Sequence, residues 1–316
     1  MSGAPSGSLQ DPDWDELGAF DEDAEDYGAL PPLVKQYGAI VLCQALFWRW
    51  VLDERAMPIR MIANWVRRRP DRMQAVVANS VPQFSAYGMA SDDPETLLLA
   101  WVPINCWVPL HHALGAGCAL LATHYGSAAW CRVAISFEVG EDVLHYAQMA
   151  WTACFPQRGV VPWKYLDRMA WSFVAVHHLI GLCAGSAAFL TEVVAWEEVQ
   201  RFIALLLVAG LPCALKAPFE MVQDLSVPSY TGRALAVIET CALLFLVWVR
   251  LVLYFPAVIS LLNRAFDEIG IVPGYLYGMV LLGVGSVFNL ASVALYAPTV
   301  IQRVRQQCAP IKKHVD

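Results

Sequence analysis

The chain alternates between long apolar runs and short polar stretches, and the apolar runs are longer than the strands of a soluble protein. Three of them, at 97–123, 169–190 and 269–302, contain no Asp, Glu, Lys or Arg. An α-helix rises about 1.5 Å per residue, so an apolar run of about 18 or more residues spans the hydrocarbon core of a bilayer. The pattern therefore predicts an all-α, polytopic transmembrane helical bundle.

We expect about seven helices in this bundle. The first begins after Pro31-Pro32 and contains two charged residues, Lys35 and Arg49; if it does not cross the membrane, six helices remain. The expected helices span about 33–52, 97–123, 127–155, 169–190, 200–216, 234–262 and 274–301.

A polar linker at 53–96 separates the first helix from the rest. It carries the pattern of a short helix at 58–69 and turn residues at Pro70, Pro82 and 91–94. The chain thus divides into an acidic tail (1–30), the first helix with its linker (31–96), the bundle (97–305) and a basic tail (306–316).

Composition supports a membrane protein, since only 16% of the residues are charged, against about 25% in soluble domains. The net charge of −7 comes from one segment: residues 1–30 hold nine Asp or Glu and no Lys or Arg. This segment is typical of disorder, and it lacks the basic and apolar regions of a cleaved signal peptide.

Basic residues follow the first, third and seventh expected helices, and seven crossings place all three groups on the same side. Glu192, Glu197 and Glu198 fall on the opposite side. The positive-inside rule makes the basic side cytoplasmic, so the N-terminus is expected outside the cytoplasm and the C-terminus within it. The basic residues are Arg55, Arg60, Arg67, Arg68, Arg69 and Arg72, then Arg158, Lys164 and Arg168, then Arg303, Arg305, Lys312 and Lys313.

Several polar side chains lie near the middle of the expected helices, where a charged group costs about 2.5–3.5 kcal/mol on insertion scales. Such residues persist when they face the bundle interior and have partners, so they are the candidate site. They are His111, His112, Glu138, Glu141, Asp142, His145, His177, His178, Arg250 and Asn289.

The third expected helix is the most informative, because Glu138, Glu141, Asp142 and His145 are three or four residues apart and share one face. Three carboxylates so close together need His or Arg partners, and we expect Arg250 to be their counter-ion. The cluster is either a functional pocket or a buried polar network that holds the second, third, fourth and sixth helices together.

The two His pairs point to further chemistry. Adjacent helical residues point about 100° apart, so one of His177 and His178 faces a given site while the other packs. A metal site formed by His111, Asp142 and His145 is an alternative, although HExxH spacing is absent. Our leading expectation includes no metal and no other cofactor. The nine cysteines form no CxxC pair and are expected to be small buried hydrophobes.

The order of these features resembles the TLC domain family of membrane proteins over about residues 97–305. The matching features, in chain order, are His112, the segment 136–142 ending in Asp142, the pair His177-His178, the Pro-containing segment 209–212, Arg250 with Pro256 after it, and Asn289.

The resemblance implies a eukaryotic protein of the endoplasmic reticulum or a related membrane that handles lipid. Ceramide synthases of this family use the His pair as acid and base in acyl transfer from acyl-CoA to a sphingoid amine, with further acids about one helix later. In the corresponding stretch of this chain, residues 205–223, no acid occurs before Glu220. The chain is therefore more similar to the smaller TLC-domain proteins. Lys312-Lys313 near the C-terminus is close to a di-lysine retrieval signal.

The leading hypothesis is a protein that binds, senses or handles membrane lipid, in which the ten polar residues line the pocket. Its expected partners are membrane lipids and no nucleic acid. The alternatives are an acyltransferase with acyl-CoA as co-substrate and His177 or His178 as base, a metal-dependent intramembrane hydrolase, and an oligomer or a structural subunit of a membrane complex.

Overall fold

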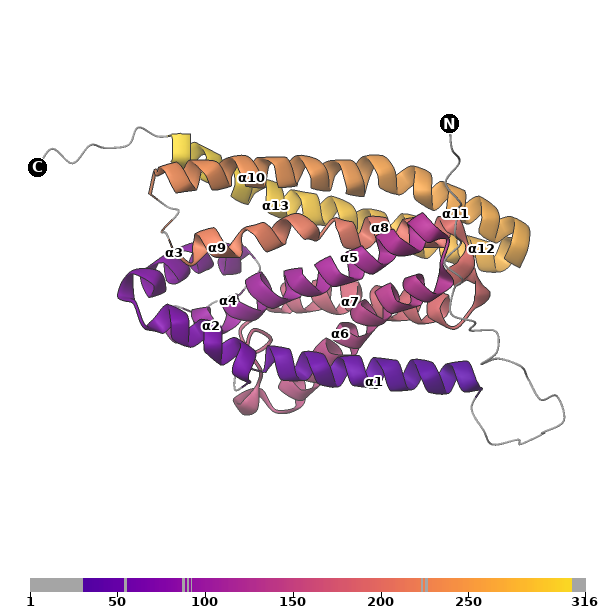
Figure 1. The fold of residues 1–316 in the computed structure, drawn as a ribbon, viewed down its shortest axis with the longest axis horizontal. Helices are drawn as coiled ribbons and strands as arrows, with labels where there is room; N and C mark the ends of the chain where they lie inside the picture. Colours follow the sequence, from indigo (N-terminus) through magenta and orange to yellow (C-terminus); the bar gives the residue numbers. More distant parts are fainter. Residues whose placement is uncertain are drawn as a thin grey trace, which may run out of the picture.

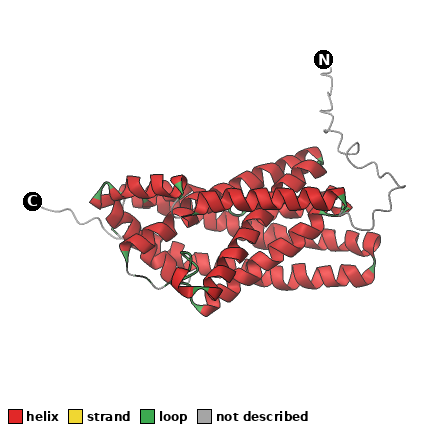
Figure 2. Ribbon diagram, turned by 90° about the horizontal axis from the view of Figure 1, so that it is seen from below, coloured by secondary structure: helices red, strands yellow, loops and turns green. Residues whose placement is uncertain are grey.

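The computed structural model describes residues 31–53, 56–86, 89, 91, 93–222, 224 and 227–308, which form an all-helical protein (Figures 1 and 2). Within these ranges no strand forms, although Met89 and Leu166 make an isolated β-bridge. The acidic tail 1–30, Arg55, Asp92 and the end of the basic tail, 309–316, lie outside the described residues.

Each of the seven expected segments contains helix. Three are single helices within one residue of the expected ends: α1 (Pro32–Leu52), α6 (Ala128–Cys154) and α7 (Arg168–Phe189). The other four are composite. In three of them a π-helical turn joins two helices: Pro103–Trp107 between α4 (Pro94–Val102) and α5 (Val108–Tyr125), Trp248–Leu253 between α10 (Tyr230–Val247) and α11 (Tyr254–Ile269), and Met279–Val284 between α12 (Ile271–Gly278) and α13 (Gly285–Cys308). In the fourth, a 3₁₀ turn at Leu211–Leu215 lies between α8 (Glu197–Val208) and α9 (Ala217–Glu220).

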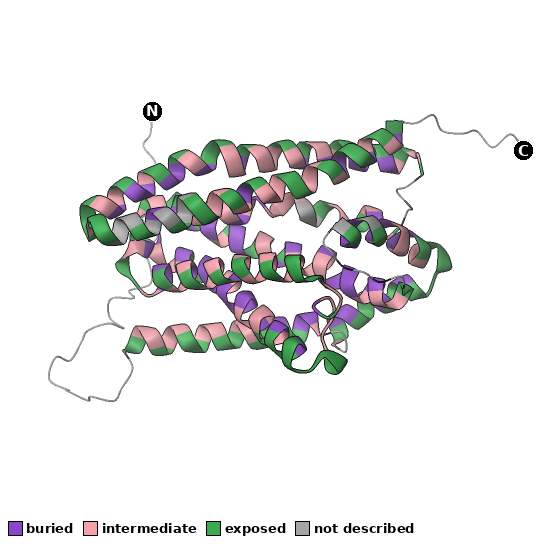
Figure 3. Cartoon of the chain, turned by 180° about the vertical axis from the view of Figure 1, so that it is seen from behind, coloured by how far each residue is buried: buried purple, intermediate pink, exposed green. Residues whose placement is uncertain are grey.

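Three continuous helical stretches are long and apolar enough to cross a membrane: Pro94–Tyr125, Arg168–Phe189 and Tyr230–Ile269. Exposed positions run along the outer faces of the helices (Figure 3), and many of them carry large apolar side chains. On α1, for example, Leu42, Leu46 and Phe47 are exposed. A surface of this kind is typical of a protein whose solvent is lipid.

The linker after α1 is more ordered than the sequence predicts. The short helix expected at 58–69 is α2 (Met57–Arg67), but a second helix, α3 (Pro70–Ala86), continues through Pro82, where a turn was expected. Tertiary packing explains the difference, since α3 places Val76 and Phe84 in a buried cluster with α2 and α4. Asp93 then caps α4, and hydrogen bonds from the Thr96 hydroxyl (2.6 Å) and the Thr96 N–H (2.9 Å) lower the pKa of its carboxyl.

The basic segments gather at one end of the bundle, as the sequence predicts. The Met89–Leu166 bridge joins the linker to the loop before α7, and α3 contacts both α9 and α13. This end lies at the left of Figure 1, and the start of α8, with Glu197 and Glu198, lies toward the right. The described residues of the three basic groups thus lie at one end of the long axis, and Glu197 and Glu198, which pair with Arg201 and Arg264, lie toward the other.

A two-residue turn aligns α5 against α6. Gly126 adopts a left-handed conformation (φ 65°) that ends α5, and the Ser127 hydroxyl accepts a hydrogen bond from the Trp130 N–H to begin α6. Residues equally distant from such a turn face each other across an antiparallel pair. His111 lies fifteen residues before Gly126 and Glu141 fifteen after it, so the turn brings these two side chains to the same level.

Gly140 allows α1 to lie directly against α6, because a Cβ at this position would overlap Gln44 Cβ and lie 3.3 Å from Gln44 backbone atoms. We expect Gly140→Ala to lower the free energy of unfolding by about 1–3 kcal/mol. Gly117→Ala is the matched control, since a Cβ there meets nothing within 4 Å; it should raise stability by about 0.5–1 kcal/mol. Thermal unfolding in detergent measures both, and equal midpoints would contradict the close approach.

Candidate functional site

The predicted cluster of His and carboxylate side chains forms where α5, α6 and α7 pack together. α5 supplies His111 and His112, and α6 supplies the four residues of its shared face. His111 is fully buried, and Glu141 and Asp142 are 3% and 5% exposed. These buried residues show that α6, the third of the expected helices, has one polar face that points inward.

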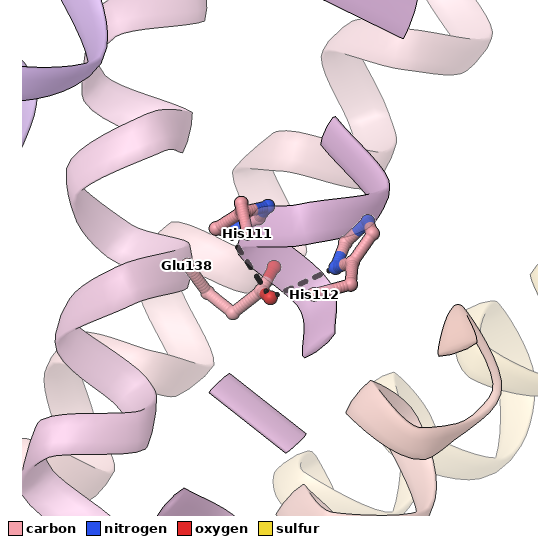
Figure 4. Close-up of side chains that lie close together, drawn as sticks. All are labelled: His111, His112 and Glu138. Carbon is pink, nitrogen blue, oxygen red and sulfur yellow. Dashed lines mark hydrogen bonds and ion pairs between the residues drawn. The ribbon is translucent and has the colours of Figure 1, made fainter. Parts of the chain in front are cut away.

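Both histidines of α5 contact Glu138 (Figure 4). Glu138 Oε1 lies 3.2 Å from His111 Nε2 and 3.0 Å from His112 Nδ1. The second nitrogen of His111, Nδ1, lies 2.9 Å from Glu141 Oε2. His111 therefore sits between two carboxylates of α6, which is the pairing that the turn at Gly126 sets up.

A second group of contacts joins α6 to α7. His178 Nδ1 bonds to Asp142 Oδ1, and His178 Nε2 lies 3.2 Å from His145 Nδ1. His145 Nε2 is 3.7 Å from Glu141 Oε1, which places the two groups of contacts next to each other. Gly181 permits this approach, because a Cβ there would overlap the Asp142 carboxylate. The carboxylates thus have histidine partners on both neighbouring helices.

His177 points away from this cluster. Its ring stacks on Phe288 of α13, with centroids 4.2 Å apart and an interplanar angle of 1°. As expected for neighbours on a helix, which point about 100° apart, His178 faces α6 while His177 faces α13. The two histidines therefore occupy different environments.

Arg250 is not the counter-ion of the three carboxylates of α6, so that prediction was wrong. Its side chain donates to Asn289 Oδ1 (Nη1, 3.0 Å) and to the Leu206 carbonyl (Nη2, 3.1 Å), and no ion pair within 4.0 Å involves Arg250 among the described residues. The π-helical turn at Trp248–Leu253 carries Arg250, and the four contacting histidines take the role that we assigned to it. Arg250 instead ties α8 to α13.

Two cavities flank α7. One, of about 280 Å³, is lined by His112, Glu138, His177, Arg250, Phe288 and Asn289 among other residues. The other, of about 500 Å³, is lined mainly by apolar side chains, with His145, Gln148 and Trp163 on its wall. Both also touch α13. Phe288 lines the first cavity and stacks on His177 and on Phe173 (centroids 5.3 Å apart), and Phe173 lines the second cavity. The polar cluster is thus reached from two sides.

The first cavity contains two polar atoms without a partner. Arg250 Nε and Asn289 Nδ2 are buried, and neither has a hydrogen-bond partner within the described part of the chain. Both atoms are donors, and a buried donor left without an acceptor costs about 1–3 kcal/mol. Two residues that line this cavity therefore carry donor atoms that the oxygen acceptors of a ligand would satisfy on reaching them.

Sequence reasoning missed a second buried ionic group near the basic end. Glu220 was not among the candidate site residues, but it lies in α9 with an exposed fraction of 0%. Its carboxylate accepts a hydrogen bond from Trp101 Nε1 (3.0 Å), and Lys216 Nζ lies 3.2 Å away. Arg303 lies 3.5 Å from Glu220 and 3.1 Å from Glu239. A charged residue inside the apolar stretch 234–262, Glu239, was the available signal.

The donor atoms that come together also differ from the predicted metal set. His111, His112 and Glu138 have nitrogen and oxygen atoms within 4.8 Å of one another, whereas the hypothesis combined His111 with Asp142 and His145. The difference arises because Asp142 faces α7 and bonds to His178.

The site has to be interpreted from its own geometry. Comparison of the chain with models of protein families, with curated proteins and with solved structures finds no match in any of the three.

Proposed function

We propose that this protein crosses a membrane about seven times, with its basic end in the cytoplasm and its N-terminus on the other side. Seven apolar segments contain helix, and the basic residues gather at one end. α8 has 12 residues, about 18 Å of helix, so it crosses only together with the 3₁₀ turn and α9 that follow it. The endoplasmic reticulum is the proposed location, on the resemblance to TLC-domain proteins.

The proposed function is binding of a membrane lipid through its oxygen-bearing head, in the manner of a TLC-type lipid sensor or carrier. The observation that carries the proposal is the pair of unpartnered donors, Arg250 Nε and Asn289 Nδ2, on the wall of the 280 Å³ cavity. A phosphate, carboxylate or amide oxygen supplies the acceptors that these donors lack.

The second cavity supports the same proposal, because it suits the acyl chain of such a lipid. It measures about 500 Å³ and its wall is mainly apolar. Binding pockets for small molecules combine an apolar wall with a few placed polar groups, and the two cavities together have this character. A lipid that extends past Phe288 from one cavity into the other would place its head group at Arg250 and its acyl chain beside Phe173 and Leu295.

Lipid retained through purification tests the proposal. The protein is purified in detergent, incubated with an equimolar mixture of phosphatidylcholine, phosphatidic acid, ceramide and oleic acid, and analysed by native mass spectrometry. Asn289→Leu removes one donor and the anchor of Arg250, and should reduce bound lipid about tenfold. Gln302→Leu, the same exchange at an exposed position of α13, should have no effect. Wild-type protein without bound lipid would contradict the proposal.

Acyl transfer is the second candidate, and the position of His177 favours it. The ring lines the cavity, and His178 behind it is bonded to Asp142. In this reading His177 takes a proton from a lipid amine, the amine nitrogen attacks the thioester carbonyl of acyl-CoA, and the coenzyme A thiol leaves. Consumption of acyl-CoA by the wild-type protein but not by His177→Ala would support acyl transfer. Lipid binding without consumption of acyl-CoA would instead support a lipid sensor or carrier.

A further inference from the structure

His111, His112 and Glu138 bring three metal-binding atoms to one point (Figure 4). Adjacent histidines on a helix rarely share a ligand, because their side chains diverge by about 100°. Here they converge by using different nitrogens: His111 approaches Glu138 Oε1 with Nε2, and His112 with Nδ1. Gly210 leaves room for the His112 side chain in this position, since a Cβ there would lie 3.0–3.1 Å from it.

Two of the three separations are close to those around a tetrahedral ion, and all three donor atoms lie within 4.8 Å of one another. Bonds of about 2.0–2.1 Å at tetrahedral angles place neighbouring donor atoms about 3.4 Å apart. The carboxylate oxygen lies 3.2 Å from His111 Nε2 and 3.0 Å from His112 Nδ1, so small movements of the side chains open the required space. Two imidazoles and one carboxylate are the ligand set of several catalytic zinc sites.

His111 gives an independent indication of a missing ligand. Its Nε2 is buried and has no hydrogen bond of acceptable geometry to any described residue, although Glu138 Oε1 lies 3.2 Å away. Glu141 Oε2, 2.9 Å from Nδ1, occupies the place that a carboxylate takes behind a metal-bound imidazole. A metal at Nε2 would let Nδ1 act as the donor to Glu141.

One side of the group remains open. The side chains of His112 and Glu138 are 29% and 23% exposed and line the 280 Å³ cavity, whereas that of His111 is 0% exposed. We propose that these three residues form a binding site for a divalent transition metal, zinc fitting the donor set best, with its fourth position open to this cavity. The proposal does not depend on lipid binding, because Arg250 and Asn289 take no part in the ligand set.

Metal content tests the proposal directly. Protein freed of any affinity tag is stripped with a chelator, incubated with zinc chloride, separated from free ion by gel filtration and analysed by inductively coupled plasma mass spectrometry. Wild type should hold about one zinc ion per chain, and Glu138→Gln and His112→Gln should each hold at least about tenfold less. His124→Gln, an exposed histidine on the same helix, should keep the wild-type content.

Cobalt distinguishes a built site from adventitious binding even if a variant folds poorly. Cobalt(II) in the wild-type protein should give the intense visible absorption of a tetrahedral complex, and zinc should displace it. Wild type without this absorption, or with less than about a tenth of an equivalent of zinc, would overturn the proposal. So would equal zinc content in wild type, Glu138→Gln and His124→Gln. Asn289→Leu should retain the metal, which separates this result from loss of lipid.

Discussion

Arg303→Met is expected to lower the free energy of unfolding by about 3–5 kcal/mol, because it leaves a buried carboxylate without its cation. Arg303 is 8% exposed, and it joins Glu239 of α10 (2% exposed) to Glu220 of α9 (0% exposed). Lys216 remains beside Glu220 after the exchange, at 3.2 Å, so Glu239 is the group left unpaired. Thermal unfolding of the detergent-solubilised protein should show a clearly lower midpoint.

Two further variants identify the cause. Arg305→Met makes the same exchange at an exposed position two residues later and should leave the midpoint nearly unchanged. Arg303→Met combined with Glu239→Met removes the unpaired charge and should regain most of the loss, since apolar replacements of buried ion pairs are often neutral. If Arg303→Met and Arg305→Met unfold at the same temperature, the ionic group is not a stabilising link between α9, α10 and α13.

The helices could be predicted because their signal lies within each segment. Apolar length located α1, α6 and α7 to within one residue at either end. α3 could not be found in this way: its sequence contains Pro82 and is mixed in polarity, and its helix is stabilised by burying Val76 and Phe84 against α2 and α4. Such contacts between segments are absent from any local pattern.

The candidate site was predictable in its members and only partly in its pairing. Helical periodicity places Glu138, Glu141 and Asp142 on one side of α6. Because a charged side chain inside the membrane costs free energy, each of them is expected to have a partner. Which helix supplies each partner depends on the rotation of the helices about their axes. Arg250 therefore appeared to be a suitable counter-ion by charge alone, whereas it reaches the carbonyl of Leu206.

Pairing also decides which residues were overlooked. Glu239 lies inside one apolar stretch and Arg303 directly after another, far apart in the sequence. They become a pair only because α10 and α13 lie side by side (Figure 1). The close contact of His111 with Glu141 is the exception. The two-residue connection at Gly126 and Ser127 fixes the level of α5 against α6, so this pairing follows from chain geometry.

Arg250→Lys is expected to weaken lipid binding almost as much as Arg250→Gln, about 10- to 100-fold in the dissociation constant, although lysine keeps the positive charge. The reason is the number of donors. Arg250 uses Nη1 to hold Asn289 and Nη2 to hold the Leu206 carbonyl, and its third nitrogen, Nε, remains for the ligand. A single ammonium group cannot occupy three separate positions, and a hydrogen bond to a charged group contributes about 1.5–3 kcal/mol.

Titration of the lipid that native mass spectrometry identifies measures this loss, with Arg264→Lys as the control on the same composite helix. Arg264 Nη1 lies 2.9 Å from Glu198 at the other end of the bundle and lines neither of the two cavities that flank α7. Its variant should bind lipid as wild type does. Wild-type affinity in Arg250→Lys would mean that only the positive charge at this position contributes to binding. The arrangement of the three guanidinium nitrogens would then have no part in recognition. Loss of lipid binding in both Arg250→Lys and Arg250→Gln, with unchanged gel-filtration profiles, assigns the lipid head to the donor pair of Arg250 and Asn289.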